Sequence, residues 1–266
     1  MSTLVCFHAH PDDECIRTAG VMAAAAEAGH RVVLVVATGG ELGEAPEDLA
    51  DGETLTDRRR AETMKSAEVL GVSRVEWLGF HDSGMAGWEQ NDAPGSFWGA
   101  DVDEAAARLA ALLTEEAADV LTVYDSNGDY GHPDHIQVHR VGHRAAEKAG
   151  TPVVYEVTFN REASVSMLKA AIERGDVKPE DVPELEGDLA FGMPEAILTT
   201  AVDVRAWIDH KRRCLASHAS QSTDTSFMLD MPTESFAAFF GTEWFIRKGA
   251  PPGIHEHALA GLDPAP

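Results

Sequence analysis

The first 160 residues alternate short apolar runs with longer segments that carry apolar residues at helical spacing. The apolar runs are rich in β-branched residues, as in residues 31–37 (RVVLVVA), which is typical of strands buried in a parallel sheet. The segments between them have the length and composition of helices. We predict strands at 4–7, 31–37, 75–78, 119–124 and 152–158, and helices at 15–28, 57–70, 102–116 and 134–148.

This alternation weakens after about residue 161. Residues 176–188 are acidic and contain proline, which favours a solvated loop, whereas 197–202 predicts a strand and 204–215 a helix. There is no internal repeat. The pattern predicts a single α/β domain over 1–266, with a Rossmann-like, mainly parallel sheet flanked by helices in 1–160 and a smaller C-terminal α/β extension in 161–266.

The composition limits the classes of partner. The formal net charge is -24, which disfavours binding to nucleic acid or to an anionic membrane. The N-terminus lacks a basic segment and predicts a buried strand rather than a signal peptide. The three cysteines match no zinc knuckle or disulfide framework. We therefore expect a cytoplasmic protein with reduced thiols and a small-molecule substrate; the sequence does not indicate its oligomeric state.

Two clusters of histidine and carboxylate residues follow the first and fourth predicted strands, at 8–14 (HAHPDDE) and 129–135 (DYGHPDH). Open parallel sheets bind ligands beyond the carboxyl ends of their strands, so both clusters are well placed for binding. Imidazole and carboxylate suit zinc, especially with one coordination position left for water. With Asp12 adjacent to Asp13, one carboxylate can bind metal while the other takes a proton from the metal-bound water.

Each cluster alone is compatible with a turn whose carboxylates favour the start of the next helix. Two such clusters at one sheet edge favour a metal site instead. No Gly-x-Gly-x-x-Gly follows the first strand, which argues against phosphate binding there. His139 and His143 follow His135 at helical spacing, and we interpret them as surface or capping residues rather than ligands. We interpret Cys15 as a small buried hydrophobe.

The segments 9–14 (AHPDDE) and 131–135 (GHPDH), in this order, resemble the motifs of the PIG-L/LmbE-like family of zinc-dependent N-deacetylases. That family includes N-acetylglucosaminyl-phosphatidylinositol deacetylases and the deacetylases and amidases of mycothiol and bacillithiol pathways. The resemblance covers most of the chain and is weakest over 161–197. Its weaker features are 40–41 (GE), 59–62 (RRAE), 70–71 (LG), 82–84 (DSG) and 218–221 (HASQ).

The resemblance implies a metal centre and a base. His10, Asp13 and His135 match the zinc ligands of the family, and Asp12 matches its general base. Zinc is the implied cofactor, although iron or another divalent ion can occupy such a site in the cell.

The resemblance also implies roles for five further residues. His132 matches the histidine that stabilises or protonates the tetrahedral intermediate, and Asp134 would orient it. Tyr130 matches a mobile tyrosine that precedes the second motif in some members. Arg59 and Asp82 match positions that contact substrate.

The implied function is that of a metal-dependent hydrolase that removes an N-acetyl or other N-acyl group from an amino-sugar-like small molecule through a zinc-activated water. Within the family, the alternative is an amidase that cleaves a mycothiol-type S-conjugate or another N-acyl natural product. A metal-binding protein without hydrolytic activity would need neither Asp12 nor His132. A phosphohydrolase with a histidine nucleophile would need a basic pocket, and residues 58–60 (RRR) are more simply interpreted as helix surface.

Overall fold

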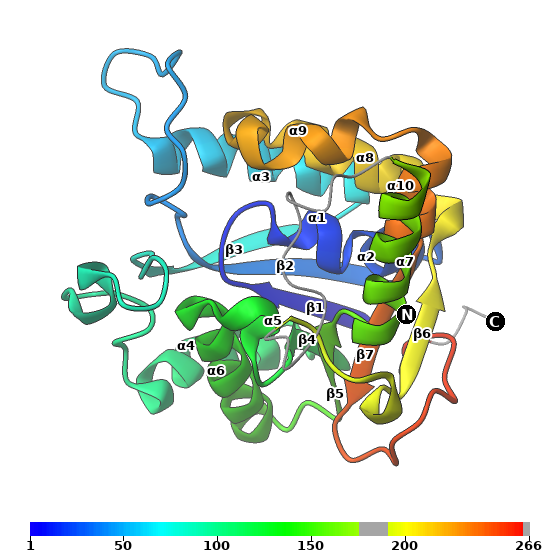
Figure 1. Ribbon diagram of the computed structural model, residues 1–266. Coiled ribbons are helices and arrows are strands. Elements are labelled where there is room, and N and C mark those ends of the chain that lie inside the picture. The colour runs from blue at the N-terminus through cyan, green and yellow to red at the C-terminus, as the bar shows by residue number, and fades with distance from the viewer. Residues whose placement is uncertain (176–190, 263–266) are drawn as a thin grey trace.

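The computed structural model describes residues 1–175 and 191–262. In that part of the chain one sheet contains the strands β1 (Thr3–His8), β2 (Arg31–Thr38), β3 (Arg74–Phe80), β4 (Val120–Tyr124), β5 (Val153–Thr158), β6 (Thr200–Asp203) and β7 (Thr242–Arg247). Their order is β3-β2-β1-β4-β5-β7-β6 (Figure 1). The first five pair in parallel, whereas β7 is antiparallel to both β5 and β6. The predicted Rossmann-like, mainly parallel sheet is confirmed.

Helices cover both faces of this sheet (Figure 1). One face carries α2 (Ala19–Glu27), α3 (Leu55–Leu70) and α8 (Ile208–Ser217), and the other carries α4 (Val102–Glu115) and α6 (Pro133–Ala149). The other helices are α1 (Asp13–Arg17), α5 (Gly128–Gly131), α7 (Arg161–Arg174), α9 (Ser222–Asp230) and α10 (Thr233–Phe240). Short 3-10 turns lie at Glu89–Asp92, Glu195–Ile197, Arg205–Trp207 and Ala219–Gln221. No described helix is long and apolar enough to cross a bilayer.

Helix α6 lies close to β4 at Gly142. A Cβ at Gly142 would lie 2.2 Å from Cγ1 of Val123 on β4, so only glycine fits there. The first turn of the same helix carries His135, which is fully buried. The close approach at Gly142 therefore helps to fix the position of His135 relative to the sheet.

Several elements differ from the sequence prediction. The predicted helix over 15–28 is two helices, because the backbone leaves helical geometry at Thr18 (φ -136°, ψ 1°). Helix α7 and strand β7 were not predicted: Ala171 is the only residue of α7 that is buried, so its apolar periodicity is weak. The expected strand begins at Thr200, and the expected helix begins at Ile208. The loop predicted at 176–188 lies outside the described residues.

A buried ion pair fastens the C-terminal third to the N-terminal core. Nζ of Lys211 lies 2.6 Å from Oε1 of Glu243 and also donates to the carbonyl of Ile16. Glu243 in turn accepts hydrogen bonds from the backbone N–H groups of Gly20 and Val21, at 2.8 and 2.9 Å. These contacts join β7, α8 and the start of α2, so the last third is packed directly against the segment that follows the first motif.

A disulfide joins α1 to α8. It links Cys15 to Cys214, which are 199 residues apart in the sequence, whereas Cys6 is free and buried. The expectation of reduced thiols is therefore wrong for this pair. Cysteine spacing gave no signal because the pairing depends on α8 folding back across the N-terminal helices. The cytoplasmic location expected from the sequence stays a prediction.

Candidate metal centre and catalytic site

The two sequence motifs meet where the order of the parallel strands reverses. Strands β1 and β4 are neighbours in the sheet, and the motif-bearing segments follow their carboxyl ends. In open α/β sheets this switch point is the usual ligand site. The ring centroids of His10 and His132 lie 4.7 Å apart, and those of His10 and His135 lie 5.4 Å apart. The fold thus brings together side chains that are more than a hundred positions apart in the sequence.

The Asp13 carboxylate lies between two imidazoles. Its Oδ2 is 3.5 Å from Nδ1 of His10, and its Oδ1 is 3.5 Å from Nε2 of His135. Neither ring nitrogen of His135 has a hydrogen-bond partner among the described residues, although both are buried. A buried polar atom without a partner is costly, and a metal ion would satisfy it. His10, Asp13 and His135 are therefore a donor set that suits a divalent metal.

Electrostatics around these residues favour a cation. Burial lowers the pKa of His10, but Asp82 and Asp13 outweigh it and hold this pKa well above its ordinary value. His10 and the carboxylates around it therefore attract positive charge, which either a proton or a metal ion supplies. Burial, in contrast, holds the pKa of His135 well below its ordinary value, so this imidazole is neutral and suited to bind metal.

His135 is held by stacking. Its ring lies on that of Tyr124, with centroids 4.3 Å apart and planes inclined by 11°. The hydroxyl of Tyr124 lies 3.0 Å from Nδ1 of His8, whose Nε2 contacts the hydroxyl of Thr18 at 2.8 Å. This chain of contacts runs from the second motif to the break between α1 and α2. Sequence reasoning did not identify Tyr124, because it ends a buried strand whose other residues are mostly apolar.

Asp12 has a backbone conformation that is rare for a residue with a side chain. Its φ is 95° and its ψ is -26°, in the left-handed region. It precedes α1 but its side chain makes no capping hydrogen bond. Instead the carboxylate accepts a bond of 2.9 Å from Nη2 of Arg59. Burial raises the pKa of Asp12 to about 6, against the opposing effect of Arg59. The helix-capping interpretation of this residue is thus not what the structure displays.

Asp134 and Asp82 both lie close to His10. Nε2 of His10 is 3.2 Å from Oδ2 of Asp134 and 3.5 Å from Oδ1 of Asp82. The Asp134 carboxylate also accepts from the backbone N–H of Ser83 at 2.9 Å. The resemblance implied that Asp134 orients His132; here its backbone N–H does so, by donating to Nδ1 of His132 at 3.1 Å. The carboxylate is instead directed at His10.

His132 has one nitrogen fixed as an acceptor. Because Nδ1 accepts the Asp134 N–H, the proton of the neutral ring resides on Nε2. Burial, reinforced by His10, lowers the pKa of His132 to about 4, which keeps the ring neutral. The Tyr130 ring lies at the edge of His135, with centroids 5.1 Å apart, and remains 42% exposed. Tyr130 therefore lies at the rim of the site, with His132 beneath it.

Arg59 links the loops after β1 and β2. Its guanidinium donates to the carbonyl of Gly40 at 2.7 Å and to that of Pro11, in addition to Asp12. A Cβ at Gly40, where φ is +62°, would lie 2.3 Å from Nη1 of Arg59. The neighbouring Arg58 is paired with Glu53 at 2.7 Å. The run of three arginines thus supplies a positioning contact, and not the basic pocket that a phosphohydrolase would need.

Buried polar residues support the first motif. Glu14 is fully buried and accepts the backbone N–H of Asp12 through Oε2 at 3.0 Å. Its Oε1 lies 2.8 Å from Nε2 of His218 and accepts from the hydroxyl of Ser66. Burial would raise the pKa of Glu14, but His218 reverses this and lowers it. Glu14 and His218 lie in segments that resemble the family, 9–14 and 218–221, whereas Ser66 gave no signal, because a single serine on a helix is unremarkable.

The sequence did not predict a second buried contact near the site. Arg17 of α1 forms an ion pair with Asp129 of the second motif, and its guanidinium lies over the ring of Phe159, 4.1 Å from the centroid. Asp129 has a φ of 69°, which is also in the left-handed region. The pair ties the two motif-bearing segments together. The sequence could not indicate this pair, because Arg17 lies in a segment whose pattern predicts a helix and nothing more.

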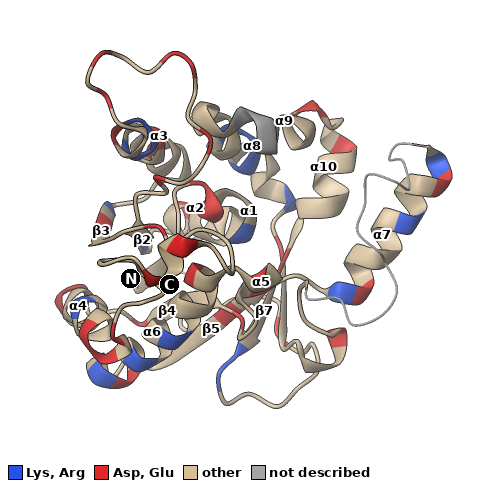
Figure 2. Cartoon of the chain, turned by 60° about the vertical axis from the view of Figure 1, so that its left-hand side comes forward, with Lys and Arg blue, Asp and Glu red and all other residues tan. Residues whose placement is uncertain are grey.

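The rim of the site is acidic on one side. The loop between β2 and α3 carries several Asp and Glu residues, which appear red in Figure 2. Within it, Glu41 accepts a bond of 3.1 Å from the backbone N–H of Asp82 and lies 2.9 Å from Nδ1 of His81. The backbone N–H of Leu42 donates to Asp82 at 3.4 Å. This loop therefore lies against the metal-facing residues and favours a neutral or cationic ligand over an anionic one.

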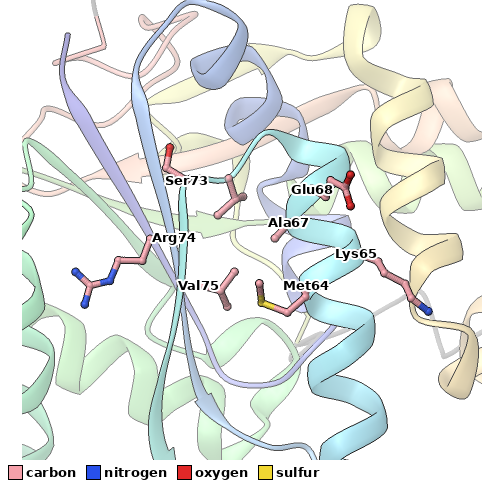
Figure 3. Close-up of a pocket in the computed structure, with 8 residues that line it drawn as sticks. Met64, Lys65, Ala67, Glu68, Ser73, Arg74 and Val75 are labelled. Carbon is pink, nitrogen blue, oxygen red and sulfur yellow. The ribbon is translucent and has the colours of Figure 1, made fainter.

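A separate hollow does not belong to this site. It has a volume of about 420 Å³ and lies between α3 and the first residues of β3, with Met64, Glu68, Arg74 and Val75 among its lining residues (Figure 3). Because β3 begins here, the hollow is at the opposite end of the strands from the two motifs. Its lining offers no histidine or cysteine.

A mainly parallel sheet with clustered imidazoles and carboxylates at its carboxyl edge defines an α/β protein with a candidate metal centre. Residues 5–146 match the family model PIG-L, which is described as GlcNAc-PI de-N-acetylase. The chain belongs to this family, whose members depend on a metal ion.

Two relatives extend the match over most of the chain. A 1D-myo-inositol 2-acetamido-2-deoxy-alpha-D-glucopyranoside deacetylase 1 of Catenulispora acidiphila is 36% identical, with 97% of this chain and 89% of the relative covered. A protein of the same name, without the final numeral, from Nocardiopsis dassonvillei is 41% identical over 81% of this chain and 83% of its own length. Among solved structures, the N,N'-diacetylchitobiose deacetylase of Pyrococcus horikoshii superposes with a TM-score of 0.56, at 21% identity, over 92% of this chain and 83% of that one. The structural likeness supports the fold.

Proposed function

We propose that this protein is a zinc-dependent deacetylase that removes the N-acetyl group from a glucosamine joined to inositol. The observation that carries the proposal is the Asp13 carboxylate between His10 and His135, 3.5 Å from each, with Asp12 beside it. The names of relatives that are 36% and 41% identical supply the substrate class.

His10, Asp13 and His135 would hold the metal. Two imidazoles and one carboxylate are a donor set that zinc favours in catalytic sites, with a further position left open. When bound, zinc would supply Lewis-acid activation of water and of the acyl carbonyl. The ligands come from a strand-to-helix loop and a buried helix start, so the backbone holds them in place before metal binds.

Asp12 is the proposed general base. Its carboxylate is partly exposed, and its pKa of about 6 lies close enough to neutrality for proton exchange at physiological pH. Arg59 holds the carboxylate in one direction, through the bond of 2.9 Å to Oδ2. The strained backbone at Asp12 has the same effect, because it directs the side chain away from the helix that it precedes.

His132 is the proposed hydrogen-bond donor to the reacting carbonyl oxygen. Its Nε2 carries the proton because Nδ1 accepts the backbone N–H of Asp134. A fixed donor directed at developing negative charge lowers the barrier, because it needs no reorganisation during the reaction. Tyr130, at the rim, and Asp82, beside His10, are proposed to contact the sugar.

The substrate assignment is tested by measuring amine release. The zinc-loaded protein is incubated with 1D-myo-inosityl 2-acetamido-2-deoxy-α-D-glucopyranoside, with free N-acetylglucosamine and with a mycothiol S-conjugate. We expect the inositol glycoside to give the highest kcat/KM and the acetyl group to appear as acetate. Faster cleavage of the S-conjugate would favour the amidase, and no turnover of any amide by protein with full metal content would contradict a hydrolase.

A further inference from the structure

A second histidine cluster lies further along α6. His139 and His143 are four residues apart on this helix and both face Glu156 of β5. Nε2 of His143 lies 2.8 Å from Oε1 of Glu156, and Nδ1 of His139 lies 3.8 Å from the same oxygen. The two imidazole rings have centroids 4.5 Å apart. The proposed catalytic function uses none of these residues.

The geometry of the three side chains suits a metal ion. One potential ligand atom from each residue lies within 4.8 Å of those from the other two. In a tetrahedral zinc site with bonds of about 2.0–2.2 Å, ligand atoms are roughly 3.4 Å apart. The upper limit of 4.8 Å exceeds this spacing by about 1.4 Å, whereas the 2.8 Å between His143 and Glu156 is shorter than it, so the side chains must rotate to close around an ion. Two histidines at i and i+4 on one helix are a common source of zinc ligands.

The backbone already orients one of these histidines. Nδ1 of His139 lies 3.0 Å from the carbonyl oxygen of Tyr124. A carbonyl only accepts, so Nδ1 carries the proton and Nε2 keeps its lone pair. Nδ1 is thus the nitrogen that lies 3.8 Å from Glu156, and Nε2 is the atom left to bind an ion. Metal-binding histidines usually donate their other N–H to a carbonyl or carboxylate in this way, which fixes the tautomer and the ring.

Among the described residues, no lysine or arginine forms an ion pair with Glu156. Within the described residues, its ion-pair partners are His139 and His143 alone. The adjacent carboxylate of Asp125 is already bonded, since it accepts from Thr158 and from the backbone N–H of Asn127. A partly buried carboxylate that faces two imidazoles and no permanent cation is a suitable place for a divalent ion.

The three side chains are also open to solvent. Their exposed fractions are 22% for His139, 17% for His143 and 16% for Glu156. An ion can therefore enter without unfolding the helix, and water can complete its coordination. His135, one turn earlier, is fully buried and belongs to the catalytic centre.

We propose that His139, His143 and Glu156 form a second metal site, which binds Zn²⁺ or a similar transition-metal ion between α6 and β5. It is separate from the catalytic centre and is expected to bind more weakly, because its ligands are partly exposed and must move to close around the ion. By joining a helix to a strand, the ion would stabilise the folded state.

The test counts zinc ions in the full-length protein. Chelator-stripped protein is titrated with Zn²⁺ by calorimetry, and bound metal is measured by elemental analysis after gel filtration. The wild type is expected to bind two ions, with a tighter and a weaker phase. His143→Gln and Glu156→Gln are each expected to lose the weaker phase, and His135→Ala is expected to lose the tighter phase only.

His81→Asn is the matched control. His81 also lies beside a glutamate, 2.9 Å from Glu41, but it has no second imidazole, so this variant is expected to keep both phases. Circular dichroism checks that each variant is folded, and His139→Asn provides an independent variant of the same site. Thermal unfolding of His135→Ala should still shift upward with added Zn²⁺.

The proposal is contradicted by a single phase in the wild type that His135→Ala abolishes, or by a weaker phase that survives His143→Gln, Glu156→Gln and His139→Asn. Failure of the catalytic assignment would be distinguishable, because it would appear as a tighter phase unaffected by His135→Ala.

Discussion

Helix α6 carries histidines in two different surroundings. His135, in the first turn, is fully buried and stacked on Tyr124. His139 and His143, one and two turns later, are partly exposed and face Glu156. Four residues advance an α-helix by about 40° more than one full turn, so each step rotates the side chain around the axis. Equal spacing along the sequence therefore leads to two different groups of partners.

The two groups also differ in how firmly they are held. Around His135 and His10, the side chains of Asp13, Asp134 and Asp82 are themselves bonded to backbone N–H groups. Around Glu156, a single backbone carbonyl orients a single histidine. A site prepared for chemistry thus has further bonds that hold its ligands, whereas a site that only binds an ion needs little more than the ligands themselves.

The largest expected effect separates the two groups directly. His135→Ala removes a proposed metal ligand from a buried position, so the tightly bound ion and the deacetylase activity should both be lost. Elemental analysis and an acetate-release assay measure the two quantities. Full metal content together with native kcat in this variant would show that His135 is not part of the catalytic centre and that the two groups of histidines do not differ in this way.

Asp12→Asn is expected to lower kcat by about 10²–10⁴-fold, as is typical for loss of a general base. Metal content should stay at the wild-type level, since asparagine keeps the shape of the side chain and its bond from Arg59. Asp101→Asn is the control, because Asp101 only caps α4 through the N–H of Glu104. Near-native kcat in Asp12→Asn would refute the base, and loss of zinc would make Asp12 a ligand.

A smaller effect is expected behind the metal centre. His218→Gln keeps a donor for Glu14 but removes the positive charge that lowers its pKa. Loss of such an outer contact costs metal centres about 10–100-fold in affinity or activity. Competition with a chelator and kcat measure the change. The exposed His257→Gln serves as control, and equal behaviour of the two variants would mean that Glu14 and His218 only support folding.

The smallest expected effect is on the fold itself. Chelation should abolish activity yet leave the far-ultraviolet circular dichroism spectrum unchanged, because the sheet and the helices packed on it, rather than a metal, hold this chain together. The melting temperature should fall only modestly. Global unfolding on chelation would instead assign the metal a structural role.

Much of the parallel core was predictable, because strands such as β2 are continuous apolar runs and α3 ends at Gly71 in a left-handed conformation. The elements of the C-terminal third were harder to predict from the sequence. Strand β7 alternates buried and partly exposed residues. It pairs antiparallel with β5, and its sequence does not indicate this partner or this direction. Helix α7 has too few buried residues to produce a periodic signal.

The candidate site also contains residues that the sequence could predict and residues that it could not. The two motifs name His10, Asp13 and His135 because their chemistry is local in the sequence. The supporting contacts are not local: Glu14 meets His218 across 204 positions, and Cys15 meets Cys214 across 199. No spacing rule reaches that far. The approach of Glu156 to His139 and His143 is likewise not local, because Glu156 lies on a strand.

The bond between Glu14 and His218 sets an order of events during protein synthesis. During translation, the segment that carries both motifs, within residues 5–146, is synthesised before Cys214 and His218. Until then the Glu14 carboxylate lacks its imidazole partner, and α1 is not joined to α8. A nascent chain can therefore pair its parallel strands early, but the loop that carries the first motif gains these contacts only after Cys214 and His218 have been added. A fragment that ends at the second motif would contain every proposed ligand and still lack the part that holds the first motif in place.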